Sequence, residues 1–215
     1  MNSTEKEISY TSTNSYTTLN KLTKETKNVW LVCHGLGYLS QYFINYFKNL
    51  NTTENYIIAF QAPNKYYQDK TFKHVGACWF TKNNTQTEIN NVCSYIDAVL
   101  AEENIPRDKN LVLFGYSQGV SVALRYLAYA QLKCKKIIIQ SGGIPKELVP
   151  DDFNFLDAMV HHVYGKQDEY LNDERIAYEK DRAETLFGKH LKITAFEGKH
   201  VVNTSFIREI ALSLQ

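Results

Sequence analysis

Six short apolar runs, separated by segments with helical spacing, constrain the fold of this chain more than any other feature. Val29-Trp30-Leu31-Val32-Cys33 is apolar without a break, which is typical of a strand buried on both faces. Similar runs follow at 56–60, 111–114, 136–139, 159–164 and 191–196. Between the runs, apolar residues recur at helical spacing over 40–50, 87–103, 117–132, 173–187 and 204–214. This alternation predicts an α/β fold, with a mostly parallel sheet and helices on both of its faces.

The first 28 residues have a different texture, polar and rich in Ser, Thr and Asn. Two short alternating stretches, at 8–11 and 16–19, predict an antiparallel hairpin that turns at Thr13-Asn14. No internal repeat or long linker interrupts the remainder. A chain of 215 residues is therefore expected to form a single domain over 1–215.

Charge and composition narrow the class of partner. The 24 basic and 23 acidic residues give a net charge of +1, without the basic stripe that nucleic-acid binding requires. The four cysteines show no metal-ligand spacing, and no apolar run reaches the roughly 18 residues of a membrane span. The first residues lack the apolar core of a secretion signal, so we expect a cytoplasmic protein, monomeric or homodimeric, with reduced thiols.

The segment Gly115-Tyr116-Ser117-Gln118-Gly119 lies between a buried strand and a helical pattern. A nucleophilic serine on such a strand-to-helix turn has a strained backbone, so residues two before and two after it must lack bulk. Gly115 and Gly119 meet this requirement. A serine helix cap is the competing interpretation, but it does not explain two glycines around the serine. Ser117 is therefore the predicted nucleophile.

The loop Cys33-His34-Gly35-Leu36-Gly37 follows the first buried strand directly. A tetrahedral intermediate needs two N–H donors that converge on its oxyanion. We assign them to the backbone amides of Gln118, the residue after the nucleophile, and of Leu36 in this loop. His34 is expected to brace the loop rather than to act as a base.

The order nucleophile, acid, histidine selects among six histidines. His34 and His74 precede Ser117, whereas His161 and His162 lie within a strand and precede any plausible acid. His190 lies at the amino end of the last strand, the edge away from the crevice where such sheets bind ligands. His200 lies just past the carboxyl end of that strand and is the predicted base.

The acid follows from the same position rule. Asp168 follows the run at 159–164 and therefore lies at the carboxyl edge. Glu169 would point away in a tight turn, and Asp173 reads as the N-terminal charge of the next helix. In the resulting mechanism His200 takes the proton of Ser117, Asp168 orients the imidazole, and water hydrolyses an acyl-enzyme. We expect no metal or organic cofactor.

Further segments extend the pattern in order: Gly76-x-x-Trp79-Phe80, Ser141-Gly142-Gly143-Ile144-Pro145, Gly165-x-x-Asp168 and Gly198-x-His200. Together with the two loops above, they resemble the phospholipase/carboxylesterase group of the α/β-hydrolase superfamily, from about residue 29 onward. The resemblance implies an α/β-hydrolase fold and esterase activity on short or medium acyl chains. It also implies a substrate-binding wall at Trp79 and Phe80, with Leu36 beside them.

One departure from that group concerns Tyr38, which occupies a position where an acidic residue usually follows His-Gly-Leu-Gly. Any substrate group that such an acid would hold is not supported here. The segment 147–156 is short, so no large lid is expected over Ser117.

Three functions remain open at this stage. The first is a carboxylesterase for small esters, and the second is a thioesterase or lysophospholipase for longer acyl chains. The third is a hydrolase fold that only binds ligands, against which the intact Ser117, Asp168 and His200 argue. In the first two cases the partner is a small-molecule ester or thioester.

Overall fold

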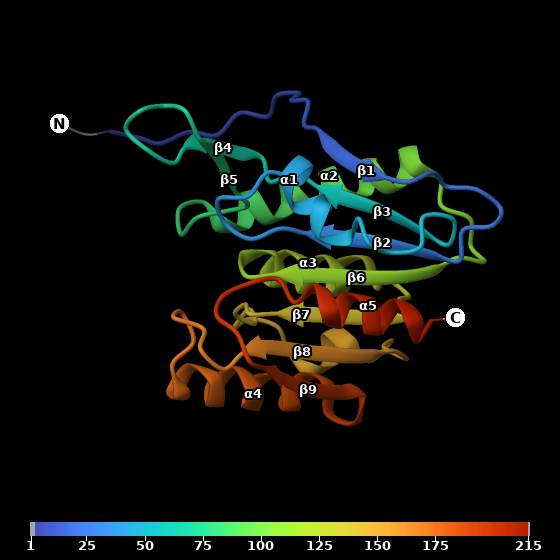
Figure 1. The fold of residues 1–215 in the computed structure, drawn as a ribbon. Coiled ribbons are helices and arrows are strands. Elements are labelled where there is room, and N and C mark those ends of the chain that lie inside the picture. Colours follow the sequence, from blue (N-terminus) through green and yellow to red (C-terminus); the bar gives the residue numbers. More distant parts are fainter. Residues whose placement is uncertain (1–2, 215) are drawn as a thin grey trace.

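The computed structural model describes residues 3–214, in which seven strands form one twisted sheet through the centre of the molecule (Figure 1). The order of the strands is β1-β3-β2-β6-β7-β8-β9, and all neighbouring pairs are parallel except β1 with β3. The strands are β1 (Tyr16–Leu19), β2 (Asn28–Cys33), β3 (Asn55–Phe60), β6 (Asn110–Tyr116), β7 (Lys136–Gln140), β8 (Met159–Gly165) and β9 (Leu191–Phe196). This is the predicted α/β-hydrolase architecture.

Helices cover both faces of the sheet, as the sequence predicted. One face packs against α2 (Thr85–Glu103), α3 (Gln118–Ala130) and α4 (Asp173–Phe187), and the other against α1 (Ser40–Phe43), the 3-10 turn η1 (Ile44–Phe47) and α5 (Thr204–Leu212). Alternate residues of β2 serve the two cores: Val29 and Leu31 belong to the first, and Trp30 and Val32 to the second. Two further 3-10 turns are η2 (Pro150–Phe153) and η3 (Gly188–His190). Within residues 3–214, no helix has the length and apolar character that crossing a membrane requires.

The predicted N-terminal hairpin is wrong in its pairing. Residues 16–19 do form β1, but β1 pairs with the open edge of β3, in the register Tyr16↔Phe60 to Leu19↔Ile57. Residues 8–11 form no strand, and Ile8 and Tyr10 are 89% and 82% exposed. The edge of β3 provides backbone hydrogen-bond partners for β1, and Tyr16 and Leu19 of β1 pack against the two cores. Residues 8–11 lack such contacts, because the Ile8 and Tyr10 side chains are exposed.

The predicted helix over 40–50 is divided into α1 and η1. The Asn45 side-chain amide donates to the carbonyls of Gln41 and Tyr42, both at 3.2 Å, and so competes with the helical backbone pattern. Phe43, Ile44 and Phe47 are nevertheless buried, so the apolar spacing identified the buried side correctly.

A second, two-stranded sheet is absent from the prediction. It pairs β4 (Asn64–Tyr67) with β5 (Val75–Cys78), antiparallel, beside the loop that follows β2. All four residues of β4 are exposed, so the strand lacks the buried alternation by which strands are found in sequence. Its importance is positional, because the Gly37 N–H donates to the Ala77 carbonyl at 2.9 Å.

Candidate active site

Ser117 occupies a sharp turn between β6 and α3. Its φ of 52° and ψ of −121° lie outside the regions that non-glycine residues favour. The Ser117 N–H donates to the Gln140 carbonyl at 2.9 Å, which fixes the turn to the neighbouring strand β7. A Cβ on Gly115 would lie 2.7 Å from the Gly119 carbonyl oxygen, and a Cβ on Gly119 would clash with the Cys33 carbonyl. The spacing of the two glycines therefore has the steric cause that the sequence suggested.

His200 lies between Ser117 and Asp168. Its Nδ1 is 2.7 Å from Asp168 Oδ2, and its Nε2 is 3.1 Å from Ser117 Oγ. The Asp168 side chain is fully buried and that of His200 is 15% exposed. Because an ionised carboxylate only accepts hydrogen bonds, Nδ1–H donates to Asp168, which leaves Nε2 to accept from the Ser117 hydroxyl. The arrangement can remove the proton of Ser117 and hold the resulting imidazolium.

Of the three candidate acids, only Asp168 is hydrogen-bonded to the His200 ring. The Asp168 Oδ1 accepts the Tyr170 N–H at 3.0 Å, so both oxygens of this carboxylate are used. Glu169 is exposed and accepts the backbone N–H of His200 at 3.3 Å. The backbone N–H of Glu169 itself, together with that contact, lowers the pKa of the Glu169 carboxyl. Asp173 opens α4, as the sequence predicted.

The loops that carry Asp168 and His200 are packed together at the ends of β8 and β9. The Gln167 N–H donates to the Gly198 carbonyl at 2.9 Å, and a Cβ on Gly165 would clash with that same carbonyl. From the other side, the Tyr116 hydroxyl donates to the His200 carbonyl at 2.9 Å. The Gln140 amide donates to the Val201 carbonyl at 2.7 Å. Neighbouring strands thus hold the histidine loop at both ends.

The loop 34–37 runs beside the turn of Ser117. His34 is fully buried, its Nε2 accepts the Ala62 N–H at 3.1 Å, and its Nδ1–H donates to the Gly35 carbonyl at 2.7 Å. Burial lowers the pKa of His34 to about 4, so its ring is neutral at pH 7. In residues 3–214, the backbone N–H groups of Leu36 and Gln118 donate to no protein acceptor, and both residues line one pocket with Ser117.

Trp79 and Phe80 lie beneath this loop and not among the residues that line the pocket. Trp79 is fully buried, and its indole N–H donates to the His34 carbonyl at 2.8 Å. The Gln118 side chain ties the same segment to α3: its oxygen accepts the Trp79 N–H at 3.0 Å, and its amide donates to the Phe80 carbonyl at 3.0 Å. These contacts fit a role in positioning the loop.

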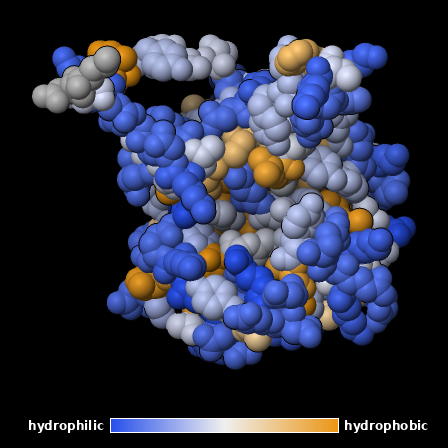
Figure 2. All heavy atoms as spheres, turned by 90° about the vertical axis from the view of Figure 1, so that its left-hand side faces the viewer, coloured by the Kyte–Doolittle hydropathy of each residue, from blue (hydrophilic) through white to orange (hydrophobic). Residues whose placement is uncertain are grey.

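The pocket beside Ser117 has a volume of about 540 Å³. It opens on the face where the parallel strands end, which is largely polar with a few hydrophobic residues near its centre (Figure 2). Its lining comprises Leu36, Ser117, Gln118, Ser121, Ser141, Gly142, Gly143, Tyr170, Leu171, Arg175 and His200. Of these, Ser121, Tyr170, Leu171, Arg175 and the Ser141–Gly143 stretch gave no sequence signal for a substrate-binding role.

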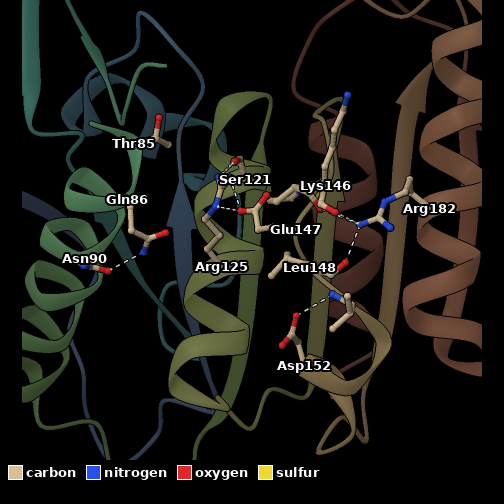
Figure 3. Close-up of polar contacts among 12 residues, drawn as sticks. Thr85, Gln86, Asn90, Ser121, Arg125, Lys146, Glu147, Leu148, Asp152 and Arg182 are labelled. Atoms are coloured by element: carbon tan, nitrogen blue, oxygen red, sulfur yellow. Dashed lines mark hydrogen bonds and ion pairs between the residues drawn. The ribbon is translucent and has the colours of Figure 1, made fainter. Parts of the chain in front are cut away.

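The wall formed by the loop after β7 is anchored by charged side chains from two helices (Figure 3). Arg125 of α3 donates to Glu147 at 2.7 Å, and Arg182 of α4 donates to the carbonyls of Pro145 and Leu148 at 2.9 and 2.8 Å. The chain between β7 and β8 contains no helix longer than the turn η2, in line with the absence of a large lid. In the part of the chain that the structure describes, no group of three or more His, Cys, Asp or Glu is arranged to hold a metal ion.

Solved structures share this fold across nearly the whole chain. Zea mays acyl-protein thioesterase 2 is 14% identical, with a TM-score of 0.69 over 93% of this chain and 97% of that one. A phospholipase/carboxylesterase from Dyadobacter fermentans is 20% identical, with a TM-score of 0.67 over 95% and 98%. The Bacillus cereus carboxylesterase is 13% identical, with a TM-score of 0.66 over 93% and 92%.

A comparison with curated proteins finds no match for this chain. The family model described as phospholipase/carboxylesterase matches residues 14–215. That span holds both loops around Ser117 and the segments that carry Asp168 and His200. The chain belongs to the phospholipase/carboxylesterase family.

Proposed function

We propose that this protein is a serine carboxylesterase that hydrolyses short- to medium-chain esters through Ser117, His200 and Asp168. The observation that carries the proposal is the continuous hydrogen-bonded line from Asp168 through the His200 ring to Ser117, at 2.7 and 3.1 Å. Such a line lets the imidazole accept a proton while the carboxylate stabilises its positive charge.

The reaction has two halves. Ser117 Oγ attacks the ester carbonyl while His200 Nε2 takes its proton, and the imidazolium then protonates the departing alkoxide. Water attacks the acyl-enzyme in the second half, with His200 again as base, and releases the acid and free Ser117. The amides of Leu36 and Gln118 stabilise the oxyanion in both halves. Their lack of protein acceptors within residues 3–214 supports this assignment.

The preference for short acyl chains rests on the lining of the pocket. Its apolar members are Leu36, Leu171 and the Tyr170 ring, and the rest are small or polar. A long acyl chain would need a longer apolar surface to leave water favourably, at roughly 0.8 kcal/mol for each buried methylene. The volume of about 540 Å³ suits a small ester.

The test is a series of 4-nitrophenyl esters from acetate to dodecanoate, together with acyl thioesters of matched length. We expect the highest kcat/KM at four to six carbons and a loss of hydrolysis in Ser117→Ala. An optimum at twelve carbons, or on thioesters, would replace the short-chain assignment by the long-chain one. Hydrolysis by Ser117→Ala at the wild-type rate would refute the proposed mechanism.

A further inference from the structure

Arg175 lines the pocket beside Ser117, and the mechanism proposed above gives it no role. It lies in the first turn of α4, just after the N-cap Asn172. Among the lining residues of the described chain it is the only one with a permanent charge, and no acidic side chain lines the pocket there.

A buried carboxylate holds Arg175 against the pocket wall. Glu179, one turn further along α4 and only 1% exposed, forms an ion pair with Arg175, with 2.6 Å between Glu179 Oε1 and Arg175 Nη2. The other Glu179 oxygen accepts the Ile144 N–H at 2.8 Å, which ties the pair to the loop after β7. The guanidinium lies so close to this loop that a Cβ on Gly143 would be 2.6 Å from Nη2.

This pairing leaves most of the guanidinium free. It has five N–H donors, and in residues 3–214 only the Glu179 contact engages them in an ion pair or hydrogen bond. The Arg175 side chain is 49% exposed, on the pocket side of the helix.

A second polar group in the same pocket, the Ser141 hydroxyl, lacks a partner among the described residues. Ser141 is 3% exposed, and its Oγ has no hydrogen-bond partner among the described residues. Its φ of 51° shows that this loop holds an unfavourable backbone conformation beside Ser117. The pocket thus combines an oriented cation with an unpaired hydroxyl, neither of which hydrolysis requires.

We infer that Arg175 is a specificity-determining residue that binds a carboxylate group of the substrate, so that the preferred substrates are esters with a second, anionic end. The planar fork of a guanidinium matches a carboxylate with two parallel hydrogen bonds. This inference rests on the proposed function, since the scissile ester must lie at Ser117 while the carboxylate reaches Arg175.

The experiment compares charged and neutral esters of matched size. On the acyl side, mono-4-nitrophenyl glutarate is set against 4-nitrophenyl pentanoate, after subtraction of the enzyme-free rate. On the alcohol side, 3-carboxyphenyl butyrate is set against phenyl butyrate. For each pair the readout is the ratio of kcat/KM for the charged ester to that for the neutral ester, so the two arms tell which side of the ester carries the anion.

In wild type, we expect one of the two ratios to exceed one. Arg175→Gln should lower that ratio about 10- to 100-fold, as expected for a lost hydrogen bond to a charged group. Arg175→Lys should lower it less, because the charge remains while the fork is lost. The matched control is Arg107→Gln, an exposed arginine in the loop before β6, at the opposite edge of the sheet, which should keep the wild-type ratio.

Ratios below one for both pairs in wild type would overturn the inference, whatever the variants do. Equal losses on charged and neutral esters in Arg175→Gln would also overturn it, since they would show a merely structural role. The proposed function fails separately, if Ser117→Ala still hydrolyses the neutral esters. Hydrolysis that needs Ser117 but shows a ratio insensitive to Arg175 would refute only the carboxylate assignment.

Discussion

The turn at Ser117 and the segment 3–15 are both irregular backbone, but their surroundings differ sharply. Around Ser117, neighbouring carbonyls leave no room for a Cβ on Gly119, and a hydrogen bond to Gln140 fixes the turn. The segment 3–15 contacts the rest of the molecule mainly through exposed side chains, such as Glu7 with Thr87 at 3.3 Å. Its Ile8 and Tyr10 side chains are almost fully exposed.

The difference shows where sequence determines local structure in this molecule. A turn that carries chemistry at a sheet edge must satisfy strict steric conditions, and these conditions select residue types at fixed spacing. The segment 3–15 meets no such conditions, so its alternation of polar and apolar residues carries little information about its pairing. Four changes test how far this contrast extends.

The largest effect is expected from the histidines at opposite edges of β9. His200→Ala should lower kcat/KM by at least about 10³-fold, because Ser117 would lose its base. His190, in η3 at the amino end of the strand, should tolerate alanine with activity within about twofold of wild type. Initial rates on 4-nitrophenyl butyrate measure both. Loss of activity in His190→Ala alone would mean that the wrong edge of the sheet has been assigned.

The next effect concerns stability at the turn. Helix propensity alone favours Gly119→Ala in α3 by up to about 1 kcal/mol. The clash of its Cβ with the Cys33 and His34 carbonyls should instead destabilise the fold by roughly 3 kcal/mol or more. Ala128→Gly, later in the same helix, is the control and should cost about 1 kcal/mol. Urea unfolding gives both values, and a stabilised Gly119→Ala would contradict the packing described around Ser117.

A smaller effect per residue is expected from pH. Burial lowers the pKa of His34, His161 and His162 to about 4, against about 6.5 in the unfolded chain. The unfolded state therefore binds protons first as the pH falls. The contribution of the three neutral histidines to the free energy of unfolding is complete above about pH 6.5 and is lost between pH 6.5 and 4. At pH 5.5 each of these histidines should lower the free energy of unfolding by roughly 1 kcal/mol relative to its value at pH 7.5.

Urea unfolding at pH 7.5, 6.5 and 5.5 measures the pH effect. Deletion of residues 3–12 removes no histidine and should leave the pH dependence as it is. His161→Phe, which removes a buried ring whose nitrogens have no partner among the described residues, should flatten it. Stability that rises between pH 7.5 and 5.5 would contradict the burial of these side chains.

The smallest effect should come from that same deletion of residues 3–12. It removes a few exposed hydrogen bonds and two exposed apolar side chains, so the free energy of unfolding should change by less than about 1 kcal/mol. Activity on 4-nitrophenyl butyrate should stay within about twofold, since none of these residues lines the pocket at Ser117. A large loss in either measurement would show that the segment is part of the folded core.

The parallel sheet and the strands that end beside the pocket could be predicted from the sequence. The buried runs behind β2 and β6 are apolar on both faces, and the run behind β8 is buried although it contains His161 and His162, so their length and position predicted strands. The sequence was insufficient for β4 and β5, whose residues carry no buried alternation, and for the break at Asn45, which depends on a side-chain hydrogen bond.

The candidate site divides in a similar way. Ser117, Asp168 and His200 follow strands directly, so the edge rule identified a set that the structure brings within hydrogen-bond distance. The resemblance placed Trp79 in the substrate-binding wall. In the structure Trp79 is buried, and its indole N–H donates to the His34 carbonyl. Arg175 was not predicted because a charged residue in the first turn of a helix is typical of a surface position. Its place in the pocket lining depends on tertiary contacts, such as its ion pair with Glu179, which accepts the Ile144 N–H.

The central claim is that Ser117 Oγ is a nucleophile activated by His200 and Asp168. An alkyl fluorophosphonate tests it most directly, because attack by a serine oxygen forms an O–P bond and releases fluoride, a change that intact mass and peptide mapping detect. We expect one adduct per chain on Ser117, much slower labelling of His200→Ala, and none at this position in Ser117→Ala. A wild-type protein that stays unlabelled, or an adduct on another residue, would contradict the mechanism.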